Sequence, residues 1–518
     1  MDMVRILGQK QRPDAHRSAV VRTNTGSKLP VFALLMCTVG SGVAQTTTIQ
    51  PTLLGRLTYT DNVDASELGG SDWVTEISPG VTMRRESGRL DGFLNANLRS
   101  LSYARDSDRN TTFLALSGRG EFEALTDLLF LDADARISRN NGSALRGRGT
   151  NDILDANKDN ETRTFSLGPR LEFRPFGTSE GLLSYRHTWF NGSGDIESRK
   201  VGNLDGRLRD EQAFGRFGWG LEYQREDASY SNTARADVMR ERYEGVVYYS
   251  PAQHVRLSVG AGRESNDFGL GRERYTIKSA GAEWTVSQRT NVAALVEDRF
   301  FGTGYNFDFN HRQARSSWSL TASRDVSSST NERPGAGDEL LFRQFYDALG
   351  SISDPVQRAS EARRLLEEQG NNAFRFVSNS YYLDESIRGG FSLVGRRSVF
   401  RLDLERSERG RLGAALPVDT QDDFAAYDNV IDHSVTASVA HRLTPQSSGN
   451  VSLRYSESEG TGLNESETDR TQLSVGIRTR LGPSVSGGIT YRYQRAEGTG
   501  DGADFTENAV TANLGIRF

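Results

Sequence analysis

Charged residues at every second position are the side chains of this chain whose types and spacing could do chemistry. Residues two apart in a β-strand share a face, so such runs gather acids and arginines on one side. Mixed charges beside Ser, Thr and Asn suit a hydrated polymer that must slide without binding tightly. Alternatively, the charges pair with one another across strands and only hold a wall together. The candidates are Asp132, Asp134, Arg136, Arg256, Arg401, Asp403, Glu405, Arg454, Arg478 and Arg492.

Catalytic and metal-binding constellations do not stand out in the sequence. Ser184 and His187 are three residues apart, so in a strand they point to opposite faces and form no dyad. Cys37 is the single cysteine, and it lies in the N-terminal segment, so a zinc site has no thiolate ligand. Asp106 and Asp108 lack the glycine and the terminal glutamate of an EF-hand loop. We therefore predict no enzyme, no metal and no cofactor.

The elements that position the charges are β-strands. Leu473, Val475 and Ile477 alternate with Ser474 and Gly476, which is the period of a strand with one apolar face. A soluble sandwich would also alternate. Charges at several successive inward positions, aromatic pairs near strand ends and alternating turn lengths favour a membrane barrel, for which 36% hydrophobic residues suffice. The same period recurs at 129–137, 255–261, 400–405 and 451–456.

The last strand runs to the end of the chain and finishes on an aromatic residue, Phe518. Such an end resembles the signal read by the outer-membrane barrel-assembly machinery, which places it in the periplasm. Counting back from it, short turns fall at 482–484 and 395–397, and longer loops at 410–427 and 191–203. The alternation predicts a large antiparallel barrel of about 22 strands, in a range of about 18–24, with an even number.

One segment, 338–370, has helical rather than strand periodicity. Asp354 is placed as an N-cap with Pro355 at the first helical position, and Gly370 ends the second helix. By parity this helical insert belongs to an external loop. Since barrels of about 22 strands are commonly plugged, we expect the insert either to constrict the lumen or to stabilise the rim.

The N-terminus predicts export through a cleaved signal peptide, residues 1–44. Six basic residues precede an apolar stretch at 29–39, and Gly-Val-Ala at 42–44 forms a cleavage site before Gln45. Cleavage removes six basic and two acidic residues and changes the net charge from −5 to −9. Such a chain has no basic patch for nucleic acid. Only three of its 57 remaining basic residues are lysines; a GC-rich genome explains this, as does a lumen suited to carboxylate or phosphate groups.

Six short motifs occur along the chain, namely YTDNV (59–63), EISPG (76–80), LRSLSY (98–103), LFLDA (129–133), GPRL (168–171) and ISDP (352–355). As a set they resemble the PEP-CTERM/exosortase system-associated outer-membrane barrel proteins, over about Thr47 to Phe518. The resemblance implies a role beside exopolysaccharide biosynthesis, as a passive polysaccharide conduit or an assembly component. It implies as partners membrane lipid and lipopolysaccharide, the barrel-assembly machinery, exopolysaccharide and periplasmic export components. The alternative is a non-conducting structural or receptor barrel that anchors matrix or surface proteins.

Overall fold

The strands of this protein form one 22-stranded antiparallel sheet, which confirms the predicted all-β class and strand count. The computed structural model describes residues 46–139, 143, 145, 161–193, 196–231, 236–328, 378–413, 422–462, 464–499 and 504–518. The predicted signal peptide, 1–44, and the predicted helical insert, 338–370, lie outside these residues. The strands are β1 (Thr46–Thr60), β2 (Asp72–Glu86), β3 (Leu90–Tyr103), β4 (Thr111–Leu125), β5 (Leu129–Arg139), β6 (Glu161–Phe173), β7 (Glu180–Gly192), β8 (Arg199–Phe214), β9 (Phe217–Tyr230), β10 (Val238–Ala252), β11 (Val255–Asp267), β12 (Glu273–Ser287), β13 (Thr290–Arg299), β14 (Gly302–Arg312), β15 (Ser316–Ser327), β16 (Tyr382–Val394), β17 (Ser398–Arg411), β18 (Asn429–Arg442), β19 (Ser447–Thr461), β20 (Ser466–Arg480), β21 (Val485–Gly498) and β22 (Phe505–Arg517).

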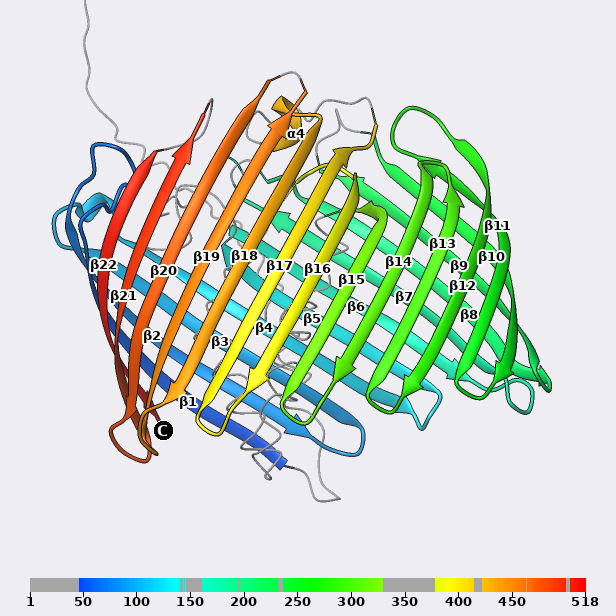
Figure 1. Cartoon of the computed structure of the whole chain (residues 1–518), viewed down its shortest axis with the longest axis horizontal. Coiled ribbons are helices and arrows are strands. Elements are labelled where there is room, and N and C mark those ends of the chain that lie inside the picture. Colours follow the sequence, from blue (N-terminus) through cyan, green and yellow to red (C-terminus); the bar gives the residue numbers. More distant parts are fainter. Residues whose placement is uncertain are drawn as a thin grey trace, which may run out of the picture. The chain divides into compact units, whose positions relative to one another are not determined.

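The sheet closes on itself as a barrel. Each strand pairs with the next along the chain, and β22 returns to pair with β1, from Thr52 opposite Arg517 to Thr60 opposite Ala509. Figure 1 shows the tilted strands running around the wall. Closure removes the unpaired edge that an open sheet of this size would present to other chains.

The connections differ in length at the two ends of the barrel. At one end, named the turn end, β16 and β17 are joined by residues 395–397, and β20 and β21 by 481–484. The opposite end, the loop end, carries longer connections such as 61–71 and 412–428, although Phe300 and Phe301 alone join β13 to β14. β1 begins and β22 ends at the turn end (Figure 1). Because each strand crosses from one end of the barrel to the other, a chain that starts and ends at the same end has an even number of strands.

One predicted loop is shorter than expected. The segment 191–203 was predicted as a long loop, but β7 continues to Gly192 and β8 already begins at Arg199. Val201 explains the difference, because it is buried in an apolar cluster and pairs opposite Thr188, which holds this part of the segment in the sheet.

Alternation gives the wall an apolar outer face. In β20, Val475 and Ile477 are exposed, whereas Gly476 is buried on the other face. The register continues this face onto the neighbouring strands, because Val475 lies opposite Val451 of β19 and Tyr491 of β21. A closed wall with apolar side chains outward suits lipid as its surroundings. Exposed members of the outer face include Leu57, Ile77, Leu221, Val259, Leu404, Leu453 and Ile489.

Buried apolar side chains gather at the loop end instead of forming one central core. One cluster joins Phe424 of the short helix α4 (Asp423–Ala426) to Tyr382 and Val430 at the ends of two strands. A 3-10 turn, η1 (Ser107–Arg109), lies in the connection between β3 and β4. In the part of the chain that the structure describes, no helix is long and apolar enough to cross a membrane. The apolar packing therefore stabilises the loop end, and the rest of the inner wall is polar.

Candidate functional site

The predicted charges lie on strand faces opposite the exposed apolar side chains. On β17, Arg401, Asp403 and Glu405 alternate with Leu404, which is exposed on the outer face. On β11, Arg256 alternates in the same way with exposed residues. The ten residues come from three parts of the wall, namely β5, β11 and β17 to β21, so they do not converge on one point. Their role along a polymer path stays a prediction.

The charges of β5 form an ion-pair cluster with neighbouring strands. Arg170 of β6 donates from Nε to Asp132 at 2.9 Å and contacts Glu121 of β4 at 2.5 Å. Asp134 lies 3.9 Å from Arg186 of β7. The two predicted acids, Asp132 and Asp134, thus pair with arginines of β6 and β7. Together with Glu121, these pairs join the four strands β4 to β7.

Arg256 on β11 also bridges strands. Its guanidinium contacts Glu283 of β12 and Glu211 of β8, which lie on opposite sides of β11 along the sheet. A fork with parallel donors can hold two carboxylates at once. Arg256 is therefore a cross-strand tie between β8 and β12 rather than a side chain open to a ligand.

Most of the predicted charges on β17 to β21 are also paired, whereas Arg478 lines a pocket at the turn end. Arg401 pairs with Asp403 two residues along its own strand, and Glu405 accepts from Arg388 Nε at 2.8 Å. Arg492 binds Glu507 of β22 through two donors, at 2.7 and 3.0 Å, and this glutamate is fully buried.

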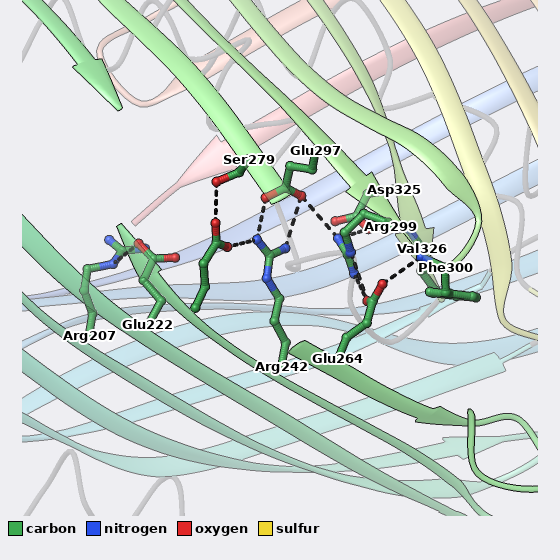
Figure 2. A network of polar contacts seen from close by, with 11 residues as sticks. Arg207, Glu222, Arg242, Glu264, Ser279, Glu297, Arg299, Phe300, Asp325 and Val326 are labelled. Atoms are coloured by element: carbon green, nitrogen blue, oxygen red, sulfur yellow. Dashed lines mark hydrogen bonds and ion pairs between the residues drawn. The ribbon is translucent and has the colours of Figure 1, made fainter. Parts of the chain in front are cut away.

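Sequence reasoning missed the most buried network of the wall, which Figure 2 shows. Arg242 of β10 pairs with Glu244 on its own strand and with Glu297 of β13. Glu297 lies 3.3 Å from Arg299, whose Nε and Nη2 donate to Glu264 of β11 at 2.9 and 2.8 Å. Two of these pairs, Arg242 with Glu244 and Glu297 with Arg299, consist of residues two apart on one strand. The period-two rule that predicted Arg401 and Asp403 would therefore also have predicted them.

The charged side chains of this network are unusually well shielded from water. The side chains of Glu264 and Arg299 are 1% and 3% exposed. The backbone N–H of Phe300 donates to the second oxygen of Glu264 at 2.8 Å, which satisfies a carboxylate that water does not reach. Removing one partner from such a set leaves an uncompensated buried charge, which is costly. The network therefore ties β10, β11 and β13 together.

A pocket at the turn end is the second feature that sequence reasoning missed. It is lined by the turns that join β16 to β17, β18 to β19 and β20 to β21, and by the end of β22. Its arginines flank three successive short turns, a pattern visible in the sequence as Arg396-Arg397, Arg442 and Arg480. The lining contains six arginines and one histidine, and it contains no aspartate or glutamate.

The histidine and serine weighed as catalytic candidates lie apart. His187 contacts Trp189 with ring centroids 4.4 Å apart on the outer face, while Ser184 lies opposite Asp205 on the inner face. Among the described residues, no group of three or more His, Cys, Asp or Glu side chains is arranged to hold a metal ion. The geometry that the structure shows is therefore that of a wall with paired charges.

Comparison with known proteins gives similar folds at low identity. No protein-family model matches the chain, and a search of curated proteins finds no relative. Among solved structures, the siderophore receptor PirA from Pseudomonas aeruginosa is 11% identical over 91% of this chain and 81% of its own, with a TM-score of 0.45. A ferric enterobactin receptor mutant from the same organism, in complex with enterobactin, is 11% identical over 91% and 81%, with a TM-score of 0.48. OpdK with vanillate, also from that organism, is 9% identical over 91% and 99%, with a TM-score of 0.34. The assignment as a closed barrel rests on the strand register.

Proposed function

We propose that this chain is an outer-membrane β-barrel that serves exopolysaccharide export, as a passive conduit or as an assembly component of the export system. The observation that carries the proposal is the two-faced wall. Its outer face exposes apolar residues and its inner face bears charges that are paired across strands. Only a closed barrel can present such strands to lipid, because each backbone N–H and C=O is satisfied within the wall.

Paired charges support passage of a neutral or weakly interacting polymer better than tight binding. An arginine already held by two carboxylates, as Arg256 is, keeps the surface hydrated but has little attraction left for a ligand. A sugar chain can then slide past without being trapped. The identity of the cargo as an exopolysaccharide comes from the family resemblance of the motifs.

The orientation follows from the two ends of the barrel. We assign the turn end, where Phe518 lies, to the periplasm and the loop end to the cell exterior, since outer-membrane barrels have short periplasmic turns and long external loops. Phe518 is exposed, and its backbone N–H donates to Pro51 O at 3.0 Å. The aromatic side chain is thus held at the seam of the barrel, where the barrel-assembly machinery would read it.

Secretion by cells tests the export role. A strain lacking this gene should lose most of its secreted exopolysaccharide, and a plasmid copy should restore it. As a matched control, a copy carrying Arg207→Leu, a change at a half-exposed pair of the inner wall, should restore secretion equally well. Normal secretion by the deletion strain would rule out the export role and favour the alternative, a non-conducting structural or receptor barrel.

A further inference from the structure

We infer that the arginine-lined pocket at the turn end is an anion-binding site, which takes a carboxylate or phosphate group carried by a polymer entering the barrel. The inference rests on the proposed function for its orientation and for the polymer. The pocket itself rests on the geometry of the turns.

Backbone hydrogen bonds between neighbouring turns bring the arginines together. The N–H of Arg442 donates to Arg397 O at 2.7 Å, and the N–H of Arg480 donates to Gln446 O at 2.8 Å. Arg517, at the end of β22, donates to Ser484 O at 2.9 Å. The strands β17 to β22 thereby place four arginines side by side along one stretch of rim, although more than a hundred residues separate the first from the last.

These arginines differ from those of the wall in having no acidic partner. No ion pair among the described residues involves Arg397, Arg442, Arg480 or Arg517, whereas Arg242 and Arg299 in the wall each contact two or more carboxylates. Like charges gathered without counter-charges repel one another. A bound anion would relieve that repulsion, so the bare cluster has the electrostatics of a binding site.

The charge of the neighbouring turn-end connections points the same way. The turn segments 288–289, 313–315, 395–397, 443–446 and 481–484 contain arginines at several positions and no aspartate or glutamate. At the loop end, the connection 61–71 is acidic and contains Asp61, Asp64 and Glu67. One mouth is therefore basic over this part of the rim and the other carries negative charge, a field that attracts anions to the turn end.

The volume and the position of the pocket indicate which kind of ligand it takes. The pocket encloses about 200 Å³, which is less than the roughly 300–1,000 Å³ of small-molecule pockets and fits one charged group of a larger chain. Val399, Ser448 and Ser486 line it from the same strand faces as the inner-wall charges. The ligand group therefore lies inside the mouth and not on the lipid side, which favours a polymer over a membrane phospholipid. Guanidinium forks match carboxylate and phosphate geometry.

Binding to the refolded full-length chain in zwitterionic nanodiscs tests the site. The probes are oligogalacturonate, polyphosphate and a neutral dextran of similar length, titrated by calorimetry. The double variant Arg442→Gln/Arg480→Gln removes two exposed arginines of the pocket. Its matched control, Arg89→Gln/Arg216→Gln, removes two exposed arginines from turn-end connections elsewhere on the rim.

We expect oligogalacturonate or polyphosphate to bind and dextran not to bind. The pocket variant should weaken binding by at least about tenfold, because each arginine supplies a charge-assisted hydrogen bond. The control should stay within about twofold, the size expected for long-range charge alone. Equal loss in both variants, or no binding of either anion, would overturn the site. In nanodiscs that also contain phosphatidylglycerol, loss of this lipid's retention by the pocket variant, with polymer binding unchanged, would make the pocket a lipid site and overturn the inference.

Failure of this inference can be separated from failure of the proposed function. A barrel that conducts ions in a planar bilayer but binds neither anion leaves the conduit standing and removes the site. A barrel that binds oligogalacturonate at the pocket but never conducts leaves the site standing and removes the conduit.

Discussion

Arg242→Leu is the change that most directly tests whether the inner wall is held by buried ion pairs. Arg242 contacts Glu244 and Glu297, whose side chains are only 3% and 10% exposed. After the change, Glu297 keeps Arg299 at 3.3 Å, but among the described residues Glu244 retains only the hydroxyl of Ser279. One carboxylate is then buried without a counter-charge.

The magnitude follows from that single orphaned carboxylate. Breaking a buried ion pair by removing one partner costs about 3–5 kcal/mol, and a wall that borders a hydrated lumen belongs at the lower end, about 3 kcal/mol. The double change Arg242→Leu/Glu244→Gln removes the orphaned charge and should recover at least half of the loss. The matched control Arg207→Leu breaks a pair at 3.4 Å with side chains 49% and 30% exposed, so it should cost less than about 1 kcal/mol.

Urea unfolding of the chain refolded in lipid vesicles, followed by tryptophan fluorescence, measures these differences. The reasoning is wrong if Arg242→Leu destabilises no more than Arg207→Leu. It is also wrong if Glu244→Gln fails to rescue, because the cost would then come from lost packing and not from an unpaired charge.

Three further changes test other parts of the structure. Gly168→Ala would place a Cβ 1.8 Å from a backbone oxygen of the adjacent strand and should destabilise the barrel by about 1–3 kcal/mol in the same urea assay, whereas Gly120→Ala, with nothing within 4 Å, should be close to neutral. Burial, and after it the charge of Glu226, raises the pKa of the Tyr381 hydroxyl well above its usual value. Because the folded pKa is the higher one, the hydroxyl contributes fully below a pH of about 10 and loses its contribution as the pH rises through the folded pKa; Tyr381→Phe should therefore flatten the alkaline limb of a stability–pH profile, and an unchanged limb would refute the assignment. Deletion of Phe518 should lower the amount of heat-modifiable, folded barrel in isolated outer membranes, while the same deletion should leave refolding in vitro nearly unchanged.

The number of strands could be predicted from sequence because a barrel strand encodes its two faces locally. Val475 and Ile477 mark the outer face within a few residues, and the terminal Phe518 supplies a fixed end from which turns can be counted. The predicted loop at 191–203 was wrong because its structure depends on contacts that are not local in the sequence. Val201 is held in the sheet by contacts with distant strands, which a local pattern does not contain.

The contacts that join different strands in the ion-pair network and in the pocket could not be predicted, because they depend on register. Glu264 and Arg299 are 35 residues apart and lie on strands that are not consecutive, so no periodicity links them. The pocket likewise needs the turn-end connections near Arg397 and Arg442 to lie beside the end of β22, which the pairing of β17 through β22 brings about.

Planar-bilayer conductance tests the central claim, that this barrel is a conduit. The refolded chain, and a variant lacking residues 338–369, should insert and give discrete conductance steps in at least one of the two forms. Oligosaccharide added at the turn end should interrupt those steps with brief, reversible blocks, as expected for a polymer that enters without binding tightly. A correctly folded barrel that stays silent in both forms would contradict the account and leave a closed structural or receptor barrel in its place.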